Sequence, residues 1–229
     1  MITHLACIMD GNRRYAQQKG QLGWFGHRQG IESVKLVADY CLKNHIPYLS
    51  LYAFSLENLN RSEIEKNYLF DLLIEQAQLG IDQFVEKGIR ICFAGEKSLY
   101  PNHIVPVCNE IEKKTASGTH LQITFLFFYG GRQEIIHGIK RIINEVKKGI
   151  LTEDHITESS LKNYLWTGNI PDPELIIRTG KVKRLSNFLL YQSAYSELYF
   201  LDCFWPELTE NHLNEAITFF NACKRNFGQ

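Results

Sequence analysis

Cysteine pairs of the kind that bind metals or catalyse redox reactions are missing from this sequence. None of its six cysteines belongs to a CxxC motif, and several lie within apolar runs. A thiol in such a run packs as a small hydrophobic group. We therefore expect no disulfide framework and a reduced, cytoplasmic setting.

An excess of either charge is also missing, because 25 lysines and arginines balance 25 aspartates and glutamates. Nucleic acids and anionic membranes attract proteins through a broad positive field, which this chain lacks. We expect no nucleic-acid partner. Any binding of phosphate must come from local clusters of cationic side chains.

Long hydrophobic runs are absent as well. The opening residues Met1–His4 carry no basic segment followed by an apolar one, and no apolar run reaches the ~18 residues that span a bilayer. We expect no signal peptide and no transmembrane segment, so a lipid product would reach a membrane by peripheral contact. GxSxG and GxxxxGK[ST] motifs are also absent, which disfavours a serine hydrolase or a P-loop NTPase.

Short apolar segments that alternate with longer helical segments are what the sequence does contain. This alternation is typical of successive βα units and a mainly parallel sheet. With 45% hydrophobic residues, the chain suits one α/β domain over residues 1–229, with about six central strands flanked by helices. The expected strands are 5–9, 48–54, 89–94, 121–128, 174–177 and 198–201, and the main expected helices are 30–43, 62–87, 133–147 and 210–225.

Polar residues gather directly after several of the expected strands. The clusters 10–14, 55–61, 129–132 and 178–186 each follow an apolar segment. In a parallel sheet the carboxyl ends of the strands meet at one edge, where loops and helix N-termini bind ligands. We therefore expect these clusters to converge on one site.

Asp10 is the first candidate for chemistry at that edge. Gly11 and Asn12 follow it, and Arg13 and Arg14 come next. Magnesium is commonly held by one or two carboxylates together with phosphate oxygens, and guanidinium groups bind phosphate. The alternative is an Asx turn beside solvated arginines. The residues alone leave both interpretations open.

Five ordered blocks of the sequence resemble the cis-prenyltransferase family, to which the undecaprenyl diphosphate synthases belong. The resemblance covers nearly the whole chain and implies an undecaprenyl diphosphate synthase-like fold. The blocks are Ile8–Ala16 with Gly26, His27 and Gly30; Tyr52–Ser55 with Glu57, Asn58, Asn60 and Arg61; Tyr129–Arg132; Ile177–Gly180 with Arg184–Leu190; and Glu197–Phe200 with Trp205 and Pro206.

The resemblance implies a site for an allylic diphosphate such as farnesyl diphosphate. In this interpretation Asp10 binds Mg²⁺ and helps the diphosphate to leave, while His27 donates a hydrogen bond or a proton to it. Cationic donors suit this reaction because they stabilise the departing anion. The other residues implied around this substrate are Gly11, Asn12, Arg13, Arg14, Tyr15, Gly23, Ser55, Leu56, Glu57, Leu59 and Arg61.

The resemblance also implies a second site, for isopentenyl diphosphate, where Glu197 would help to place Mg²⁺. Asn58 matches the family's proposed proton acceptor. A neutral amide is a weak base, so Asn58 could instead orient water or phosphate. The residues implied around isopentenyl diphosphate are Arg178, Arg184, Leu185 and Ser186.

Several positions depart from the family pattern. Arg13 replaces a usual glycine and Gly23 a usual arginine, so the two changes could compensate for each other. Tyr15 and Leu59 stand where relatives usually have tryptophan. Lys181 and Val182 replace a usual Gly-Glu pair, and Arg225–Gly228 only partly match an arginine-rich tail that in relatives reaches the partner subunit.

The expected function is repeated cis addition of isopentenyl diphosphate by a homodimer, with undecaprenyl diphosphate as product. Phe125, Phe127 and Phe128 add aromatic bulk to one strand, which indicates either dense core packing or a barrier in the product tunnel. A barrier would favour the alternative, a short-chain synthase. A non-catalytic partner subunit is disfavoured because Asp10 and the Arg178 and Arg184 pair are all present.

Overall fold

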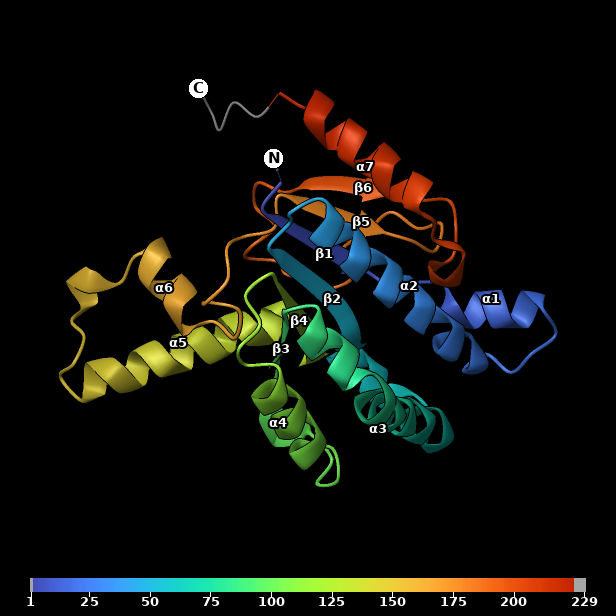
Figure 1. Cartoon of the computed structure of the whole chain (residues 1–229). Coiled ribbons are helices and arrows are strands. Elements are labelled where there is room, and N and C mark those ends of the chain that lie inside the picture. Colours follow the sequence, from blue (N-terminus) through green and yellow to red (C-terminus); the bar gives the residue numbers. More distant parts are fainter. Residues whose placement is uncertain (1, 225–229) are drawn as a thin grey trace.

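The computed structural model describes residues 2–224, and this part of the chain forms a six-stranded sheet (Figure 1). All strand pairs are parallel, in the order β3-β4-β2-β1-β5-β6. The predicted α/β class is confirmed, and each strand lies within one residue of its expected bounds. The strands are β1 (His4–Ile8), β2 (Tyr48–Ser55), β3 (Ile89–Ala94), β4 (Leu121–Tyr129), β5 (Leu175–Arg178) and β6 (Glu197–Phe200).

Residues 2–224 form seven α-helices, six of them between strands and α7 after the last strand. Four of them match the expected helices, but α2 begins at Phe25 rather than Gly30. Three short helices, α1, α4 and α6, were not predicted. The last helix ends at Ala222, three residues before its expected end at residue 225, and the tail 225–228 lies outside the described residues. The helices are α1 (Asn12–Gln18), α2 (Phe25–Lys43), α3 (Glu63–Glu86), α4 (Val105–Lys114), α5 (Gly131–Lys147), α6 (Glu158–Tyr164) and α7 (Glu210–Ala222).

The two faces of the sheet carry cores of unequal size. Along β1, Leu5 and Cys7 enter the larger core, whereas Ala6 and Ile8 enter the smaller one, because successive side chains of a strand point to opposite faces. Helices α2, α3, α4 and α7 contribute buried apolar residues to the larger core. Loop residues, Phe188 and Leu189 among them, cover the smaller core.

Strand β4 ends in a bulge that turns two aromatic rings to the same face. Phe54 of β2 pairs with Phe127, but the next pair is Ser55 with Tyr129, which leaves Phe128 without a partner across the ladder. Phe128 has a positive φ of 51°. Phe127 and Phe128 therefore both enter the larger core, with ring centroids 4.9 Å apart.

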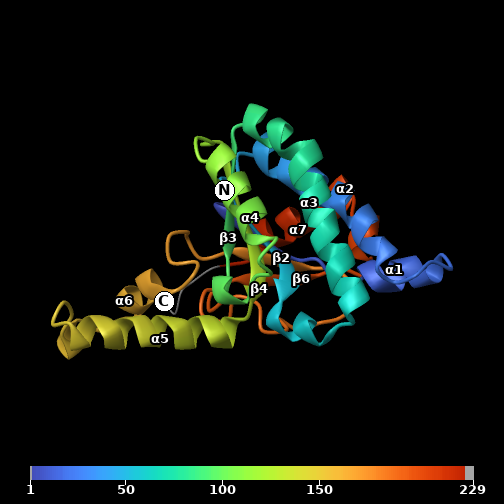
Figure 2. The same ribbon diagram turned by 90° about the horizontal axis from the view of Figure 1, so that it is seen from below.

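Helices α2 and α3 lie next to each other on one side of the sheet, while α5 and α6 pack together and project away from it (Figure 2). Two ion pairs join α2 to α3: Arg28 with Glu75 at 2.6 Å, and Lys87 with Asp39 at 2.6 Å. In residues 2–224 we find no helix both long and apolar enough to span a bilayer.

Candidate functional site

The site forms where β2, β1 and β5, three adjacent strands, reach their carboxyl ends. Asp10 lies two residues after β1, Ser55 closes β2, and Arg178 closes β5. The structure thus brings the polar clusters 10–14, 55–61 and 178–186 to one edge, as the topology of a parallel sheet requires.

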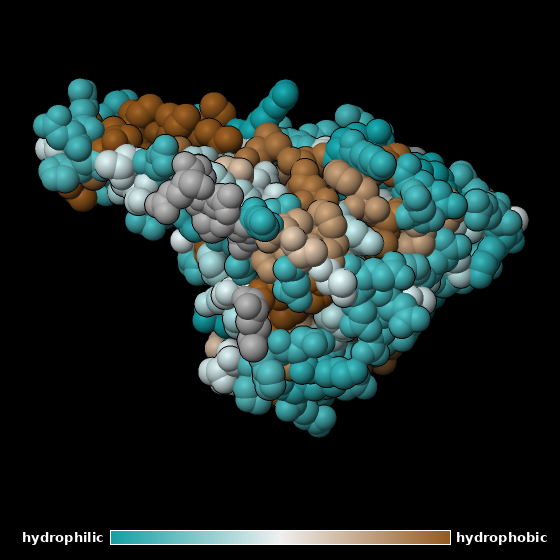
Figure 3. Space-filling view, turned by 90° about the horizontal axis from the view of Figure 1, so that it is seen from above, coloured by the Kyte–Doolittle hydropathy of each residue, from teal (hydrophilic) through white to brown (hydrophobic). Residues whose placement is uncertain are grey.

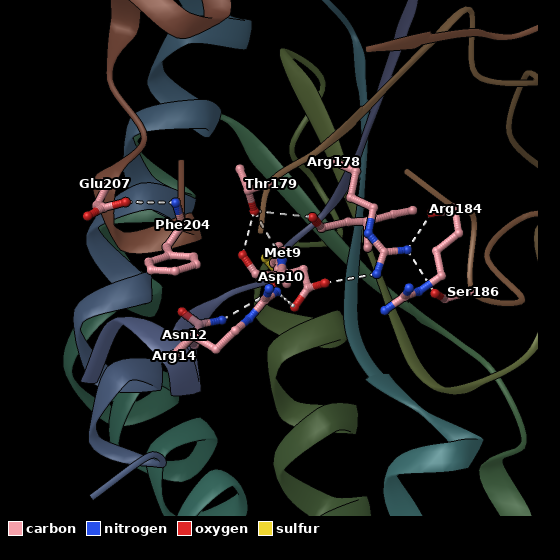
Figure 4. Close-up of polar contacts among 11 residues, drawn as sticks. Met9, Asp10, Asn12, Arg14, Arg178, Thr179, Arg184, Ser186, Phe204 and Glu207 are labelled. Atoms are coloured by element: carbon pink, nitrogen blue, oxygen red, sulfur yellow. Dashed lines mark hydrogen bonds and ion pairs between the residues drawn. The ribbon is translucent and has the colours of Figure 1, made fainter. Parts of the chain in front are cut away.

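Two arginines hold the carboxylate of Asp10 (Figure 4). Arg14 Nη2 donates to Oδ1 at 3.1 Å, and Arg178 Nη2 donates to Oδ2 at 2.8 Å. Arg14 also lies over the ring of Phe204, 5.3 Å from its centroid. The two cations fix the carboxylate and leave donors of their own for a further anion.

The backbone of Asp10 is fixed by Thr179, the residue that directly follows β5. Thr179 Oγ1 donates to the Asp10 carbonyl at 2.7 Å and accepts from the Asp10 amide at 3.1 Å. Gly180 has a φ of +92°, and a Cβ there would lie 2.8 Å from the carboxyl carbon of Asp10. A glycine is therefore needed at position 180 for conformation and for space.

Arg178 connects Asp10 to the loop that follows β5. Its side chain is 5% exposed, and Nη1 donates to the carbonyl of Arg184 and, at 2.8 Å, to Ser186 Oγ. Its Nε is buried without a hydrogen-bond partner in the described chain. A buried guanidinium donor without a partner is costly, so this atom calls for a partner that the described chain does not supply.

A second group of charges surrounds Glu65, a buried carboxylate on α3. Arg61 Nη1 donates to it at 3.1 Å, and Arg13 Nη1 lies 3.4 Å away. His27 Nε2 is 4.0 Å from Glu65 and, within the described chain, has no hydrogen-bond partner. Burial, together with Arg61 and Arg13, lowers the pKa of His27 to about 3. The imidazole is therefore neutral at physiological pH and able to donate one hydrogen bond.

The loop after β2 is the 3-10 turn η1 (Leu56–Asn60), and Asn58 caps it. Asn58 Oδ1 accepts from the Ser55 amide at 3.2 Å. Ser55, Glu57 and Asn58 all border the cavity described next, whereas Leu59 is 36% exposed. The Asn58 side chain thus has a local structural task besides any role toward substrate.

A large cavity of about 1270 Å³ extends from Asp10 into the space between α2, α3 and the sheet. This volume exceeds the ~300–1,000 Å³ of ordinary small-molecule pockets. Its mouth carries the polar residues Asp10 and Arg178. Apolar side chains line its interior, among them Ile31, Val34, Leu73, Phe93, Phe125 and Phe127. Such a cavity suits a ligand with a charged head and a long apolar tail.

Not every predicted residue lies at this mouth. Glu197 opens β6 and pairs in register with Leu175, three residues before Arg178, so within one chain it lies at the opposite end of the strand from Asp10. Tyr15 lies on α1 beside Lys19. Gly23 packs on Arg13, whose Nε would lie 3.3 Å from a Cβ at position 23.

Sequence reasoning missed residues whose task is to position others. Thr179 fixes the backbone of Asp10. Glu65 lies within 4.0 Å of two arginines and one histidine. Asn187 joins loops that are distant in the chain. Thr179 and Asn187 lie in blocks quoted above, beside better recognised arginines. Only the fold shows what they contact.

The donor set fits a magnesium ion bound together with substrate. In residues 2–224 no three His, Cys, Asp or Glu side chains gather to hold a metal by themselves. Asp10 supplies one carboxylate at the mouth, and the nearby Oδ1 of Asn12 is buried without a partner in the described chain. One carboxylate completed by phosphate oxygens is a usual arrangement for Mg²⁺.

Known proteins similar to this chain share one family. A prenyltransferase family model, described as undecaprenyl diphosphate synthase, matches residues 8–228. The chain is 40% identical over 225 residues to a farnesyl-diphosphate-specific ditrans,polycis-undecaprenyl-diphosphate synthase of Micrococcus luteus, covering 98% of this chain and 90% of that protein. It is 40% identical over 228 residues to an isoprenyl transferase of Clostridium perfringens, covering 100% and 90%.

Solved structures agree with this assignment. Lavandulyl diphosphate synthase from Lavandula x intermedia, solved with dimethylallyl diphosphate, has a TM-score of 0.95 at 28% identity, covering 100% of this chain and 98% of that one. A probable undecaprenyl diphosphate synthase from Campylobacter jejuni has a TM-score of 0.82 at 30% identity, covering 100% and 99%. The chain therefore belongs to the undecaprenyl diphosphate synthase family of prenyltransferases.

Proposed function

We propose that this protein condenses isopentenyl diphosphate with an allylic diphosphate, farnesyl diphosphate by preference, and repeats the addition with cis geometry. The observation that carries the proposal is the cluster of Asp10, Arg14 and Arg178 at the mouth of a large apolar cavity. The diphosphate groups would bind at the mouth of the cavity, and the growing hydrocarbon tail would enter its interior.

The allylic diphosphate would bind beside α1, against Asn12, Arg14 and the neutral His27. Its C1–oxygen bond breaks with the electron pair leaving on diphosphate, and the nearby guanidinium groups stabilise that negative charge. The buried Nε2 of His27 would donate to a diphosphate oxygen, which would satisfy an atom that now has no partner in the described chain. Mg²⁺, held by Asp10 and phosphate oxygens, would neutralise further charge when bound.

Isopentenyl diphosphate would bind along the loop after β5. Arg178, Arg184 and Ser186 would hold its diphosphate, and the unpartnered Nε of Arg178 supports this placement. Its double bond attacks C1 of the allylic fragment, and loss of one proton from the new intermediate restores a double bond. Asn58 borders the cavity and would accept that proton or orient the group that does.

The remaining implied residues would surround the diphosphate groups of the two substrates. Arg61 and Arg13, both near Glu65, would add positive charge on the allylic side, and Glu197 would reach a metal only by a contact that one chain does not form. The residues proposed to shape the substrate channel without supplying a cationic group are Gly11, Tyr15, Gly23, Ser55, Leu56, Glu57, Leu59 and Leu185.

Undecaprenyl diphosphate is the proposed product, because relatives that are 40% identical over nearly the whole chain bear that name. One observation favours a shorter product as the second candidate. The rings of Phe93, Phe125 and Phe127 all border the cavity and occupy part of its depth.

The proposed active form is a homodimer assembled through α5. Ile136, Ile139 and Ile143 recur at helical spacing and are 40–51% exposed. Figure 3 shows apolar surface gathered along the projecting α5–α6 arm. An apolar stripe of this kind marks an interaction site, and a second copy would cover it. The product would leave this assembly by peripheral contact with a membrane.

The test of the proposal is an incorporation assay. The protein is incubated with farnesyl diphosphate, radiolabelled isopentenyl diphosphate and Mg²⁺, and the extracted products are sized by chromatography. Label in cis-polyprenyl chains supports the proposal, and label that stays in the aqueous phase contradicts it. Chelation of the metal should abolish incorporation.

A further inference from the structure

Asn187 joins two loops that belong to different substrates in the proposed function. Its Nδ2 donates to Glu57 Oε1 at 2.8 Å and to Gln133 Oε1 at 3.0 Å. Its Oδ1 accepts from the amide of Arg132 at 2.9 Å, and its carbonyl accepts from the amide of Gly131 at 2.7 Å. The residue thus uses both ends of its amide and its backbone at once.

The conformation of this segment needs such contacts. Ser186 and Asn187 have positive φ values of 52° and 65°, and Leu189 follows with 39°. A left-handed conformation is unfavourable for non-glycine residues, although asparagine tolerates it better than most. The loop therefore holds its shape only where its surroundings fix it.

The N-terminal turn of α5 leaves room for the Asn187 amide. A Cβ at Gly130 would lie 2.7 Å from Asn187 Nδ2 and 2.4 Å from Gln133 Oε1. Glycine at this position therefore leaves space for the ends of the Asn187 and Gln133 side chains. A larger side chain at position 130 would displace the ends of the Asn187 and Gln133 side chains.

A continuous series of contacts leads from Asn187 to the centre of the site. Ser186 precedes it and accepts from Arg178 Nη1 at 2.8 Å, while Arg178 Nη2 donates to Asp10. A shift of Asn187 would therefore move the group that holds Arg178. Glu57, at the other end, belongs to the loop that borders the allylic side of the cavity.

We infer that Asn187 is a positioning residue that ties the isopentenyl diphosphate loop to the allylic loop, so that the two diphosphate subsites form together. This inference rests on the proposed function. Asn187 touches no reacting atom in it. Its hydrogen bond to Glu57 makes binding of one substrate favour binding of the other, which is a coupling between two sites.

This role is separable from folding. The contact between Asn187 and Glu57 is exposed to water, where a charge-assisted pair contributes little to the stability of the fold. Loss of the contact should therefore change the kinetics much more than the melting temperature.

The experiment exchanges donor and acceptor across the contact. Asn187→Asp has the same shape and keeps an acceptor for the Arg132 amide, but it places a carboxylate against Glu57. We expect KM for isopentenyl diphosphate to rise about tenfold, because 1.4 kcal/mol corresponds to that factor. Asn187→Asp combined with Glu57→Gln restores one donor and one acceptor, and should recover at least half of the loss on a logarithmic scale.

A matched control and a second measurement complete the test. Lys183→Gln changes the charge of the same loop by one unit without touching Glu57, and should change KM less than twofold. Binding of isopentenyl diphosphate is also measured with and without an unreactive thio analogue of farnesyl diphosphate. The analogue should tighten binding in the wild type and in the exchanged pair, but not in Asn187→Asp.

The outcomes separate the inference from the proposed function. An unchanged KM in Asn187→Asp overturns the inference. So does a double variant whose change in KM equals the product of the changes in Asn187→Asp and Glu57→Gln alone. In both cases turnover by the wild type still upholds the proposed function. A wild-type protein that transfers no prenyl group contradicts the proposed function itself. A melting temperature within about 2 °C of wild type shows that the kinetic changes do not come from unfolding.

Discussion

Arg178 Nη2 lies 2.8 Å from Asp10 Oδ2, although 168 positions separate the two residues in the chain. Adjacent parallel strands, β1 and β5, bring them together. The Arg178 side chain is 5% exposed and that of Asp10 30% exposed, so the arginine is anchored inside while the carboxylate faces the cavity mouth. The pair therefore places one negative and one positive group where two diphosphates would meet.

Removing the charge of Asp10 should abolish most of the turnover. Asp10→Asn keeps the shape and an oxygen acceptor for Arg178 but binds Mg²⁺ poorly. We expect kcat to fall by about 10²–10³, the usual loss for a group that stabilises developing charge. Asp71→Asn, which neutralises an exposed aspartate of α3, is the control and should keep wild-type kcat. Comparable rates in the two variants would refute the assignment of Asp10.

The compensation between Arg13 and Gly23 gives a second prediction. Arg13 packs over Gly23 and pairs with Glu65 at 3.4 Å, so it already occupies the space that a side chain at 23 would enter. Arg13→Gly should raise KM for the allylic substrate about tenfold. The double variant Arg13→Gly with Gly23→Arg should reverse most of that rise, and a double variant as weak as the single one would exclude compensation.

The aromatic end of the cavity gives a third prediction. Phe127 borders the cavity, whereas Phe128 packs behind it and does not. Phe127→Ala should lengthen the products by at least one prenyl unit, because removing the ring deepens the space for the tail. The sequence alone made both rings candidates. The bulge of β4 turns both to one face, and of the two Phe127 is the ring that borders the cavity.

Phe128→Ala is the matched control for chain length. Both substitutions remove a buried ring and destabilise the fold by about 3–5 kcal/mol, so folded content is checked by circular dichroism first. Phe125→Ala, at a less buried position that also borders the cavity, provides a milder variant. Product lengths unchanged in Phe127→Ala and Phe125→Ala would show that the rings serve only core packing.

The fold was largely predictable because each strand is a short apolar run with its own polar cluster after it. The helices α1 and α6 were missed because seven residues carry too little periodicity to stand out from a loop. The convergence of Asp10 and Arg178 followed from parallel topology. The roles of Glu65 and Asn187 could not be predicted, because they depend on contacts between loops whose relative positions no local pattern encodes.

Glu197 is a residue that the family pattern identifies as a site residue, but within one chain it lies far along the strand from Asp10. Its register with Leu175 is fixed by the pairing of β5 and β6. A sequence block identifies a residue type but not its place along the strand relative to the site. The proposed magnesium role of Glu197 therefore stays a prediction.

Assembly through α5 gives a fourth prediction. Ile139→Glu places a charge in the centre of the exposed apolar stripe and should convert the proposed dimer into a monomer in light scattering after gel filtration. Ile64→Glu changes an equally apolar and even more exposed residue, 69% against 40%, on α3. It should leave the mass unchanged. A monomeric wild type, or a dimeric Ile139→Glu, would contradict this interface.

Acid should destabilise the fold through His4. Burial lowers the pKa of His4 from 6.5 to about 4. The unfolded chain binds a proton below about pH 6.5 while folded His4 does not, so stability is lost as pH falls from 6.5 to 4, by about 3 kcal/mol. His4→Gln should flatten the fall in unfolding free energy measured by urea denaturation.

His27 contributes in the same direction, because its pKa is also lowered, to about 3. A double variant His4→Gln with His27→Gln should therefore be flatter still between pH 6.5 and 4. A slope identical in the wild type and both variants would show that neither histidine is buried in the neutral form.

A crystal structure of the protein with isopentenyl diphosphate, an unreactive thio analogue of farnesyl diphosphate and Mg²⁺ would test the shared site of the two diphosphates. We expect both diphosphates at the cavity mouth, one within hydrogen-bonding distance of Arg14 and the other of Arg178, with the metal on Asp10 and the farnesyl tail between α2 and α3. Diphosphates bound away from these arginines, or a tail outside the cavity, would contradict this expectation.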